Sequence, residues 1–169
     1  MTAIDPRLQI DSRLDLTLER VIRAPRAAIW RAWTEPSRLE QWWVPAPTVA
    51  RIDRLEVRPG GAFVTSMSDD GQVFLPHTDG IFLVVEPHDR LVFTNAIDSA
   101  WRPAAPAPVP MTAEITLSEH PDGTAYRAIV RHGNPDDRDR HEELGFYDGW
   151  GSVTSALAAL VEKETAPGR

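Results

Sequence analysis

The sequence lacks cysteine and has no long apolar run. Without cysteine the chain has no disulfide bond, no thiolate nucleophile and no cysteine metal ligand, and it fits a reducing compartment. No segment approaches the roughly eighteen apolar residues that a transmembrane helix needs, and residues 1–13 lack the apolar core of a signal peptide. We therefore expect a cytoplasmic protein that does not insert into a membrane.

The sequence has fewer basic than acidic residues. It contains 18 Lys and Arg residues and 25 Asp and Glu residues, which gives a formal net charge of −7. A domain that binds nucleic acid normally carries a basic patch that neutralises phosphate groups. The sequence therefore predicts no nucleic-acid partner.

Motifs of common catalytic and cofactor sites are also missing. There is no Gly-x-Ser-x-Gly elbow and no glycine-rich loop of the kind that binds phosphate. The run from His141 to Gly145 lacks the second histidine of the zinc protease motif. We expect neither a metal nor a cofactor, and the charged run 136–143 is interpreted as the solvated face of a helix.

What is present is the composition of an ordinary globular domain, with 42% apolar and 25% charged residues in a chain of 169. That length suffices for one substantial core. No internal repeat or linker divides the chain. We expect an N-terminal arm over residues 1–13, a single domain over residues 14–163 and a short tail over residues 164–169.

Alternation of apolar and polar residues predicts an antiparallel sheet. It is clear at 14–22 and at 111–117, and it is blurred at 48–57. Pro76 cannot donate to a ladder, so the part of its strand around 73–77 is expected at an edge or a bulge. Because short turns join successive strands, the pairing should be antiparallel. Further strands are expected at 63–67, 81–86, 91–97 and 126–132.

Two short helices and one long helix are expected around this sheet. The first short helix follows Pro25, and the second opens at Pro36 and runs to the Trp42-Trp43 pair. Asn134 can cap a charged helix that ends near 143. From Phe146 onward apolar residues follow a 3.6-residue period, which predicts a long C-terminal helix beginning near Gly145. The expected fold is α+β, with a curved sheet gripping the last helix.

Several motifs resemble one known family, the activator of heat-shock-protein-90 ATPase homologue-like proteins. They are Ala24-Pro25, Ile29 to Pro36, Trp42-Trp43, Arg58 to Phe63, Gly80, Glu86-Pro87, Arg90 to Thr94 and Gly149-Trp150. The family belongs to the START and birch-pollen-allergen (SRPBCC) superfamily. The resemblance implies the helix-grip fold, in which seven antiparallel strands wrap around the C-terminal helix and two short helices follow the first strand.

The superfamily also implies an apolar cavity between sheet and helix. Its members hold lipids, polyketides, hormones or other small apolar molecules, and some are cyclases or hydrolases. In the eukaryotic co-chaperone the related domain follows a separate N-terminal domain, for which about thirteen residues leave no room. Chaperone activation is therefore not expected, and a stress-response or chaperone-associated interaction module is kept as an alternative.

The resulting functional hypothesis is a protein that binds a small apolar molecule. Large aromatic side chains and a few polar groups on apolar strand faces are typical of such sites. Trp101 lies in the proline-rich segment Ser99–Pro110, which we interpret as a loop over the cavity. The simpler interpretation of most of the aromatic residues is that they belong to the core, whereas Trp42 and Trp43 lie where a pocket mouth is expected. The candidate ligand-binding residues are Trp42, Trp43, Phe63, Met67, Phe93, Asn95, Trp101, His132 and Trp150.

An enzyme of the cyclase, aromatase or hydrolase type in the same cavity is the second hypothesis. It would need a positioned acid or base, such as His132 with an acidic neighbour. No residue pattern identifies a catalytic group, and the simpler interpretation of His132 is a strand-end histidine partly in solvent or bonded to the backbone. A homodimer is left open.

Overall fold

The structure, a computed structural model, describes residues 4–167. Residues 1–3 of the expected arm and residues 168–169 of the expected tail lie outside this range. In the described part of the arm, residues Pro6–Leu8 form a short 3-10 helix, η1, whose Asp5 side chain accepts a hydrogen bond from Arg7 N.

Seven strands form one antiparallel sheet in the order β1-β7-β6-β5-β4-β3-β2. The strands are β1 (Asp15–Ile22), β2 (Val49–Leu55), β3 (Ala62–Ser68), β4 (Leu75–Glu86), β5 (Arg90–Thr94), β6 (Thr112–His120) and β7 (Gly123–Arg131). The helices are α1 (Arg26–Thr34), α2 (Pro36–Leu39), α3 (Pro135–Glu143) and α4 (Phe146–Thr165). The described residues contain no helix with the length and apolarity to cross a membrane.

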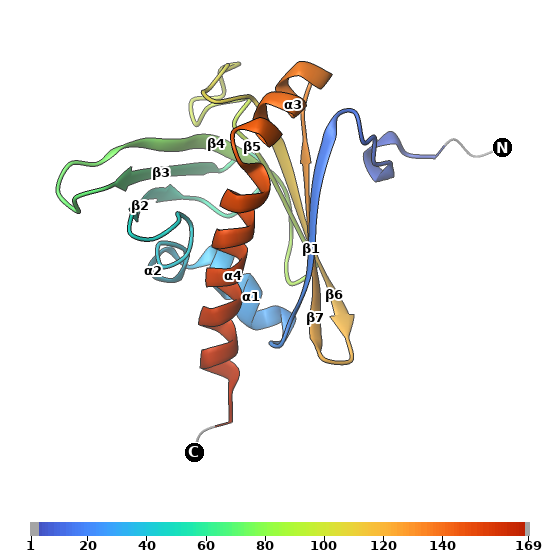
Figure 1. Cartoon of the computed structure of the whole chain (residues 1–169), viewed down its shortest axis with the longest axis vertical. Coiled ribbons are helices and arrows are strands. Elements are labelled where there is room, and N and C mark those ends of the chain that lie inside the picture. Colours follow the sequence, from blue (N-terminus) through green and yellow to red (C-terminus); the bar gives the residue numbers. More distant parts are fainter. Residues whose placement is uncertain (1–3, 168–169) are drawn as a thin grey trace.

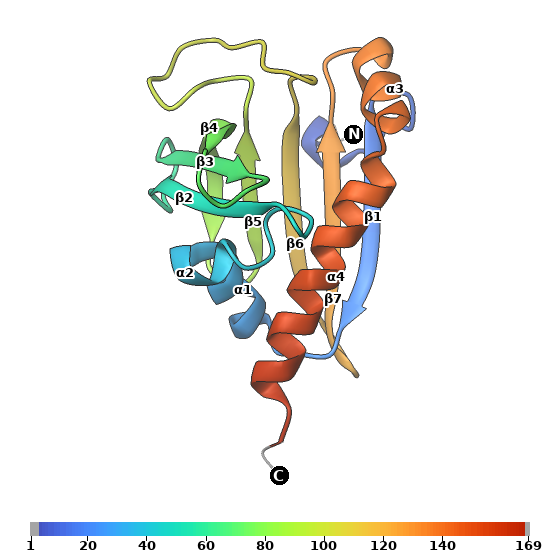
Figure 2. The same cartoon turned by 60° about the vertical axis from the view of Figure 1, so that its left-hand side comes forward.

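The sheet bends around α4, which confirms the predicted α+β helix-grip architecture. Figures 1 and 2 show β1, β7 and β6 along one side of α4, and β2, β3 and β4 beyond its other side. Helices α1 and α2 lie near the C-terminal half of α4. The stripe predicted along α4 is buried at Phe146, Leu157 and Val161, because it faces the sheet.

Strand β4 contains the bulge that Pro76 predicted. Thr65 pairs with Thr78 but Ser66 pairs with Pro76, so His77 is the extra residue on the longer strand. Because β4 has β3 and β5 as neighbours, it is not an edge strand. The missing N–H of Pro76 is instead accommodated by the bulge.

Two elements are shorter than predicted. Helix α2 ends at Leu39, and Trp42 and Trp43 follow in a turn whose backbone N–H groups bond to the Leu39 carbonyl oxygen. Strand β5 ends at Thr94, because the Thr94 hydroxyl accepts a hydrogen bond from Ala96 N and begins a turn. Both ends are set by local hydrogen bonds that the apolar pattern does not reveal.

The helical caps at the end of the sheet follow the prediction. Asn134 Oδ1 accepts a hydrogen bond of 2.8 Å from Asp137 N, which caps α3. Gly145 has φ of 95°, a left-handed conformation that favours glycine, and it turns the chain from α3 into α4. Helix α3 is thereby held close to the first turn of α4.

The outer face of the sheet carries a buried charge. Glu114 on β6 is 5% exposed, and its carboxylate accepts hydrogen bonds from Arg90 Nε at 2.7 Å and from Arg131 Nη2 at 3.3 Å. Arg131 also donates to the Arg7 carbonyl oxygen at 2.8 Å. The arm is therefore attached to the face of the sheet opposite α4.

Candidate functional site

A pocket of about 360 Å³ lies between α4 and the half of the sheet that contains β3 and β4. Its walls come from the α1 and α2 region, from β3, β4 and β7, from the loop between β5 and β6, and from α3 and α4. Apolar and aromatic side chains dominate the lining. Such a lining and volume are typical of sites for small molecules.

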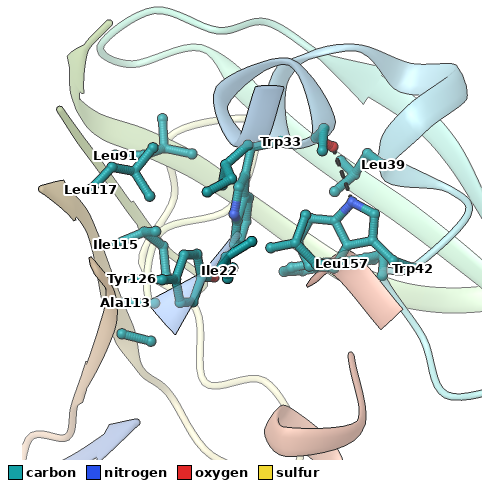
Figure 3. Packing of buried hydrophobic residues seen from close by; sticks show 14 of the residues in the cluster. Ile22, Trp33, Leu39, Trp42, Leu91, Ala113, Ile115, Leu117, Tyr126 and Leu157 are labelled. Atoms are coloured by element: carbon teal, nitrogen blue, oxygen red, sulfur yellow. Dashed lines mark hydrogen bonds between the residues drawn. The ribbon is translucent and has the colours of Figure 1, made fainter. Parts of the chain in front are cut away.

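An aromatic cluster forms the inner wall of the pocket. The ring of Trp43 lies 5.3 Å from Trp33, 5.1 Å from Phe63 and 5.9 Å from Phe93, measured between centroids. Trp33 and Trp43 line the pocket, whereas Phe63 and Phe93 are buried behind them and do not. Trp42 also lines it, and its indole Nε1 donates to the Ala32 carbonyl oxygen at 3.1 Å (Figure 3).

Helix α4 forms the opposite wall with Gly149, Trp150, Val153 and Thr154. Trp150 stacks on Phe146 with ring centroids 5.4 Å apart, so its ring is held by the first turn of the helix. A Cβ atom added to Gly149 would meet no heavy atom within 4 Å. The absence of a side chain at this position therefore keeps part of the pocket open.

The loop between β5 and β6 closes the third side. Asn95 holds its two ends together, because its Oδ1 accepts from Met111 N at 2.7 Å and its Nδ2 donates to the Val109 carbonyl oxygen at 3.4 Å. Ala107, Pro108, Val109 and Met111 line the pocket with Asn95. Across from them lies Met67 on β3, another candidate residue.

Trp101 lies in the same loop but outside the pocket. Its side chain is 70% exposed, packs against Gly60 and donates from Nε1 to the Gly60 carbonyl oxygen at 2.8 Å. The loop is also fixed by Asp98 and by Asp79, whose carboxylates accept from backbone N–H groups of the loop. The segment interpreted as a cover is thus a fixed wall, and Trp101 attaches it to the turn between β2 and β3.

His132 also lies outside the lining, but it contacts a pocket residue that sequence patterns did not indicate. Its Nε2 lies 2.8 Å from Nδ1 of His141 on α3, and its Nδ1 lies 2.8 Å from the Leu14 carbonyl oxygen. His141 lines the pocket. The neighbour of His132 is therefore a second histidine rather than an acidic residue.

Burial shifts the pKa values of three residues that line the pocket. Desolvation, with a smaller contribution from the nearby charge of His132, lowers the pKa of His141 to about 4. Desolvation raises the pKa of the Tyr126 phenol well above its ordinary value, opposed in part by the Trp33 indole beside it (Figure 3). Desolvation also lowers the pKa of His77, whose Nδ1 lies 3.2 Å from the Thr65 hydroxyl.

The lowered pKa of His141 should make stability depend on pH. The unfolded chain takes up a proton at this residue near pH 6.5, whereas the folded chain does so near pH 4. Since the unfolded state binds more protons in this window, the free energy of unfolding should decrease as pH falls from 6.5 to 4, by up to about 1 kcal/mol per pH unit. Urea unfolding at several pH values would measure it.

His141→Phe removes the titrating ring and keeps an aromatic side chain in its place. The pH dependence of its unfolding free energy should be weaker than that of the wild type in the same window. An unchanged profile would show that His141 takes up its proton equally easily in both states.

The comparisons with known proteins agree on the fold. A family model described as Activator of Hsp90 ATPase homolog 1-like protein matches residues 23–162. A solved structure from Nitrosomonas europaea is 40% identical with a TM-score of 0.81, and the alignment covers 94% of this chain and 100% of that chain. A comparison with curated proteins gives no match.

Two more distant structures are also similar. A protein from Chromobacterium violaceum is 25% identical with a TM-score of 0.68, over 88% of this chain and 98% of that chain. An AHSA1-like protein from Aeromonas hydrophila is 18% identical with a TM-score of 0.67, over 92% and 97% of the two chains. At 18% identity the similarity concerns the fold alone.

Proposed function

Because this chain belongs to the family of Activator of Hsp90 ATPase homolog 1-like proteins, we propose that it binds a small, largely apolar molecule in the pocket between the sheet and α4. The observation that carries the proposal is the pocket of about 360 Å³ with Trp33, Trp43 and Trp150 in its walls. Rigid aromatic walls offer a ligand a large apolar contact area at little cost in side-chain entropy.

The interior explains why the pocket stays open. Trp33 and Trp43 are 2% and 8% exposed and pack against each other and against further rings, so neither side chain is free to collapse inward. The bulge in β4 and the loop anchored by Asn95 hold the other walls at a distance. A pocket that exists before the ligand arrives binds without the cost of forming it.

Catalysis in the same pocket is the second candidate. The observation that favours it is His141, whose imidazole lines the pocket and is oriented by a hydrogen bond to His132. An oriented imidazole is the commonest general base in enzymes. Catalysis can be tested only with a known substrate, whereas ligand binding can be tested with a general apolar probe.

Titration with the uncharged fluorescent probe N-phenyl-1-naphthylamine tests the proposal. We expect saturable binding to one site, because the probe moves from water into an apolar pocket. Trp43→Ala should weaken binding by about tenfold, since it removes one wall of the pocket. Circular dichroism must first show that the variant is folded, because truncation of a buried Trp costs about 3–5 kcal/mol.

Trp30→Ala is the matched control. Trp30 lies on α1 next to the same cluster, is half-buried and does not line the pocket. Its variant should bind the probe as the wild type does. If the wild type shows no saturable binding, the ligand-binding proposal fails, and an interaction module acting through the outer surface becomes the better hypothesis.

A further inference from the structure

His141 is held at the α3 end of the pocket by a chain of two hydrogen bonds. The Leu14 carbonyl oxygen lies 2.8 Å from His132 Nδ1, and His132 Nε2 lies 2.8 Å from His141 Nδ1. The His141 ring also packs edge-on against Phe146, with centroids 5.1 Å apart. Contacts on two sides therefore fix the orientation of this ring.

The same chain fixes which nitrogen of His141 carries the proton. A carbonyl oxygen only accepts hydrogen bonds, so His132 Nδ1 must be protonated. In the neutral ring His132 Nε2 is then an acceptor, and His141 Nδ1 must donate to it. A neutral His141 is left with an unprotonated Nε2. The backbone of Leu14 thus sets the tautomer of a side chain in the pocket.

Nε2 of His141 is available to a ligand. It has no hydrogen-bond partner within residues 4–167. It is also not one of the fully buried polar atoms, so a ligand can reach it. Apart from His77, the other described residues of the lining are apolar, aromatic or neutral polar. A carboxylate placed here would meet a lone pair, whereas a hydroxyl group would donate a hydrogen bond to it.

We propose that His141 Nε2 is a fixed hydrogen-bond acceptor in the pocket, and that the ligand is a neutral, largely apolar molecule with a hydroxyl group that donates to it. The inference rests on the proposed function, because it specifies the chemistry of the same pocket. His141 is the specificity-determining residue, and His132 is a positioning residue that acts through it.

Two further hydroxyl groups lie deeper in the pocket. Tyr126 on β7 and Thr154 on α4 are 2% and 3% exposed, and both line the pocket. The Thr154 hydroxyl has no hydrogen-bond partner within residues 4–167 and is not among the buried unpartnered atoms, and the Tyr126 hydroxyl lies beside the Trp33 indole. Because a hydroxyl both donates and accepts, these groups accommodate either polarity. These two hydroxyl groups therefore do not select for a donor on the ligand, whereas the unprotonated His141 Nε2 does.

Paired probes test the selectivity by calorimetry. 4-Hydroxybiphenyl and 4-methylbiphenyl have nearly the same shape, and only the first donates a hydrogen bond. The ratio of their dissociation constants is compared between the wild type and His141→Phe, so that differences in probe hydration cancel. We expect the ratio to shift by about tenfold toward the methyl probe in the variant, the effect of one hydrogen bond. An unchanged ratio would overturn the proposal.

Thr154→Val is the matched control, because it removes a pocket hydroxyl with little change of shape. It should leave the ratio of the two dissociation constants at the wild-type value. If Thr154→Val shifts the ratio and His141→Phe does not, the hydroxyl is recognised at the deep end and the assignment to His141 is wrong. Biphenyl-4-carboxylate should bind at least tenfold more weakly than 4-hydroxybiphenyl, and equal binding would contradict a neutral ligand.

A spectroscopic measurement tests the tautomers without any ligand and without a variant that could fail to fold. In long-range proton–nitrogen correlation spectra of the labelled protein at pH 8, His132 and His141 should both be protonated at Nδ1 only. The pH matters because one further proton on the pair would place an N–H on His141 Nε2. A proton on His141 Nε2 at pH 8 would refute the inference and leave the ligand-binding proposal intact, whereas failure of every probe to bind would refute both.

Discussion

Gly80→Ala is expected to lower the free energy of unfolding by about 4 kcal/mol or more, which is a large part of the stability of a typical domain. A Cβ atom at this position would lie 2.0 Å from the carbonyl oxygen of Thr94 and 3.0 Å from its carbonyl carbon. Both atoms belong to the backbone of β5 and cannot rotate away. The variant must therefore separate β4 from β5 in the middle of the sheet.

Gly133→Ala is the control for this prediction. Gly133 is exposed between β7 and α3, and an added Cβ would meet nothing within 4 Å. Its unfolding free energy should stay within about 0.5 kcal/mol of the wild type. Urea unfolding followed by circular dichroism measures both variants. A Gly80→Ala protein as stable as the wild type would mean that β4 and β5 do not approach as closely as described.

Gly149→Phe is expected to reduce probe binding by at least a hundredfold without weakening the fold. The position lines the pocket and has open space where a side chain would begin, so an aromatic ring can occupy the volume of the ligand. Glycine inside a helix costs about 1 kcal/mol relative to alanine, and phenylalanine costs less. The variant should therefore be at least as stable as the wild type, which separates blocked binding from misfolding.

Gly151→Phe distinguishes pocket filling from a general effect on α4. Gly151 lies two residues further along the helix, also has open space around an added Cβ, and does not line the pocket. This variant should gain similar helix propensity and keep wild-type affinity for N-phenyl-1-naphthylamine. Unchanged binding by Gly149→Phe would place the ligand elsewhere and contradict the proposed site.

Sequence patterns predicted the fold well because most elements have a local signal, with the blurred alternation of β2 as an exception. The alternation in β6, the cap at Asn134 and the turn at Gly145 are set by neighbours in the chain, and the structure has them as predicted. The ends of α2 and β5 were placed too late, since side-chain and turn hydrogen bonds decide them. The bulge at His77 followed from the missing N–H of the preceding proline.

The pocket lining was harder to predict, because it depends on which faces meet in space. Five candidate residues line it, namely Trp42, Trp43, Met67, Asn95 and Trp150. Phe63 and Phe93 lie one layer behind Trp43, a distinction that alternation along a strand cannot make. Trp101 and His132 lie outside the lining: Trp101 donates to the Gly60 carbonyl oxygen, whereas His132 contacts His141, which lines the pocket.

His141 and Gly149 were missed for different reasons. His141 stands in a run of charged residues that reads as a solvated helical face, and only the return of α3 toward the end of β7 brings it to His132. No signal in the sequence indicates this contact. Gly149 did leave a signal, because glycine in an apolar helical stripe is unfavourable and indicates a position where space is needed.

The anchoring of the loop between β5 and β6 has a kinetic consequence. Its attachments at Asn95, Asp98 and Trp101 are made in the free protein, so its conformational entropy is lost on folding rather than on association. Ligand uptake should then proceed at a rate close to that of rigid docking, with a heat capacity change that reflects only the apolar area covered. Ligands should then differ in affinity mainly through their dissociation rates and not through their association rates.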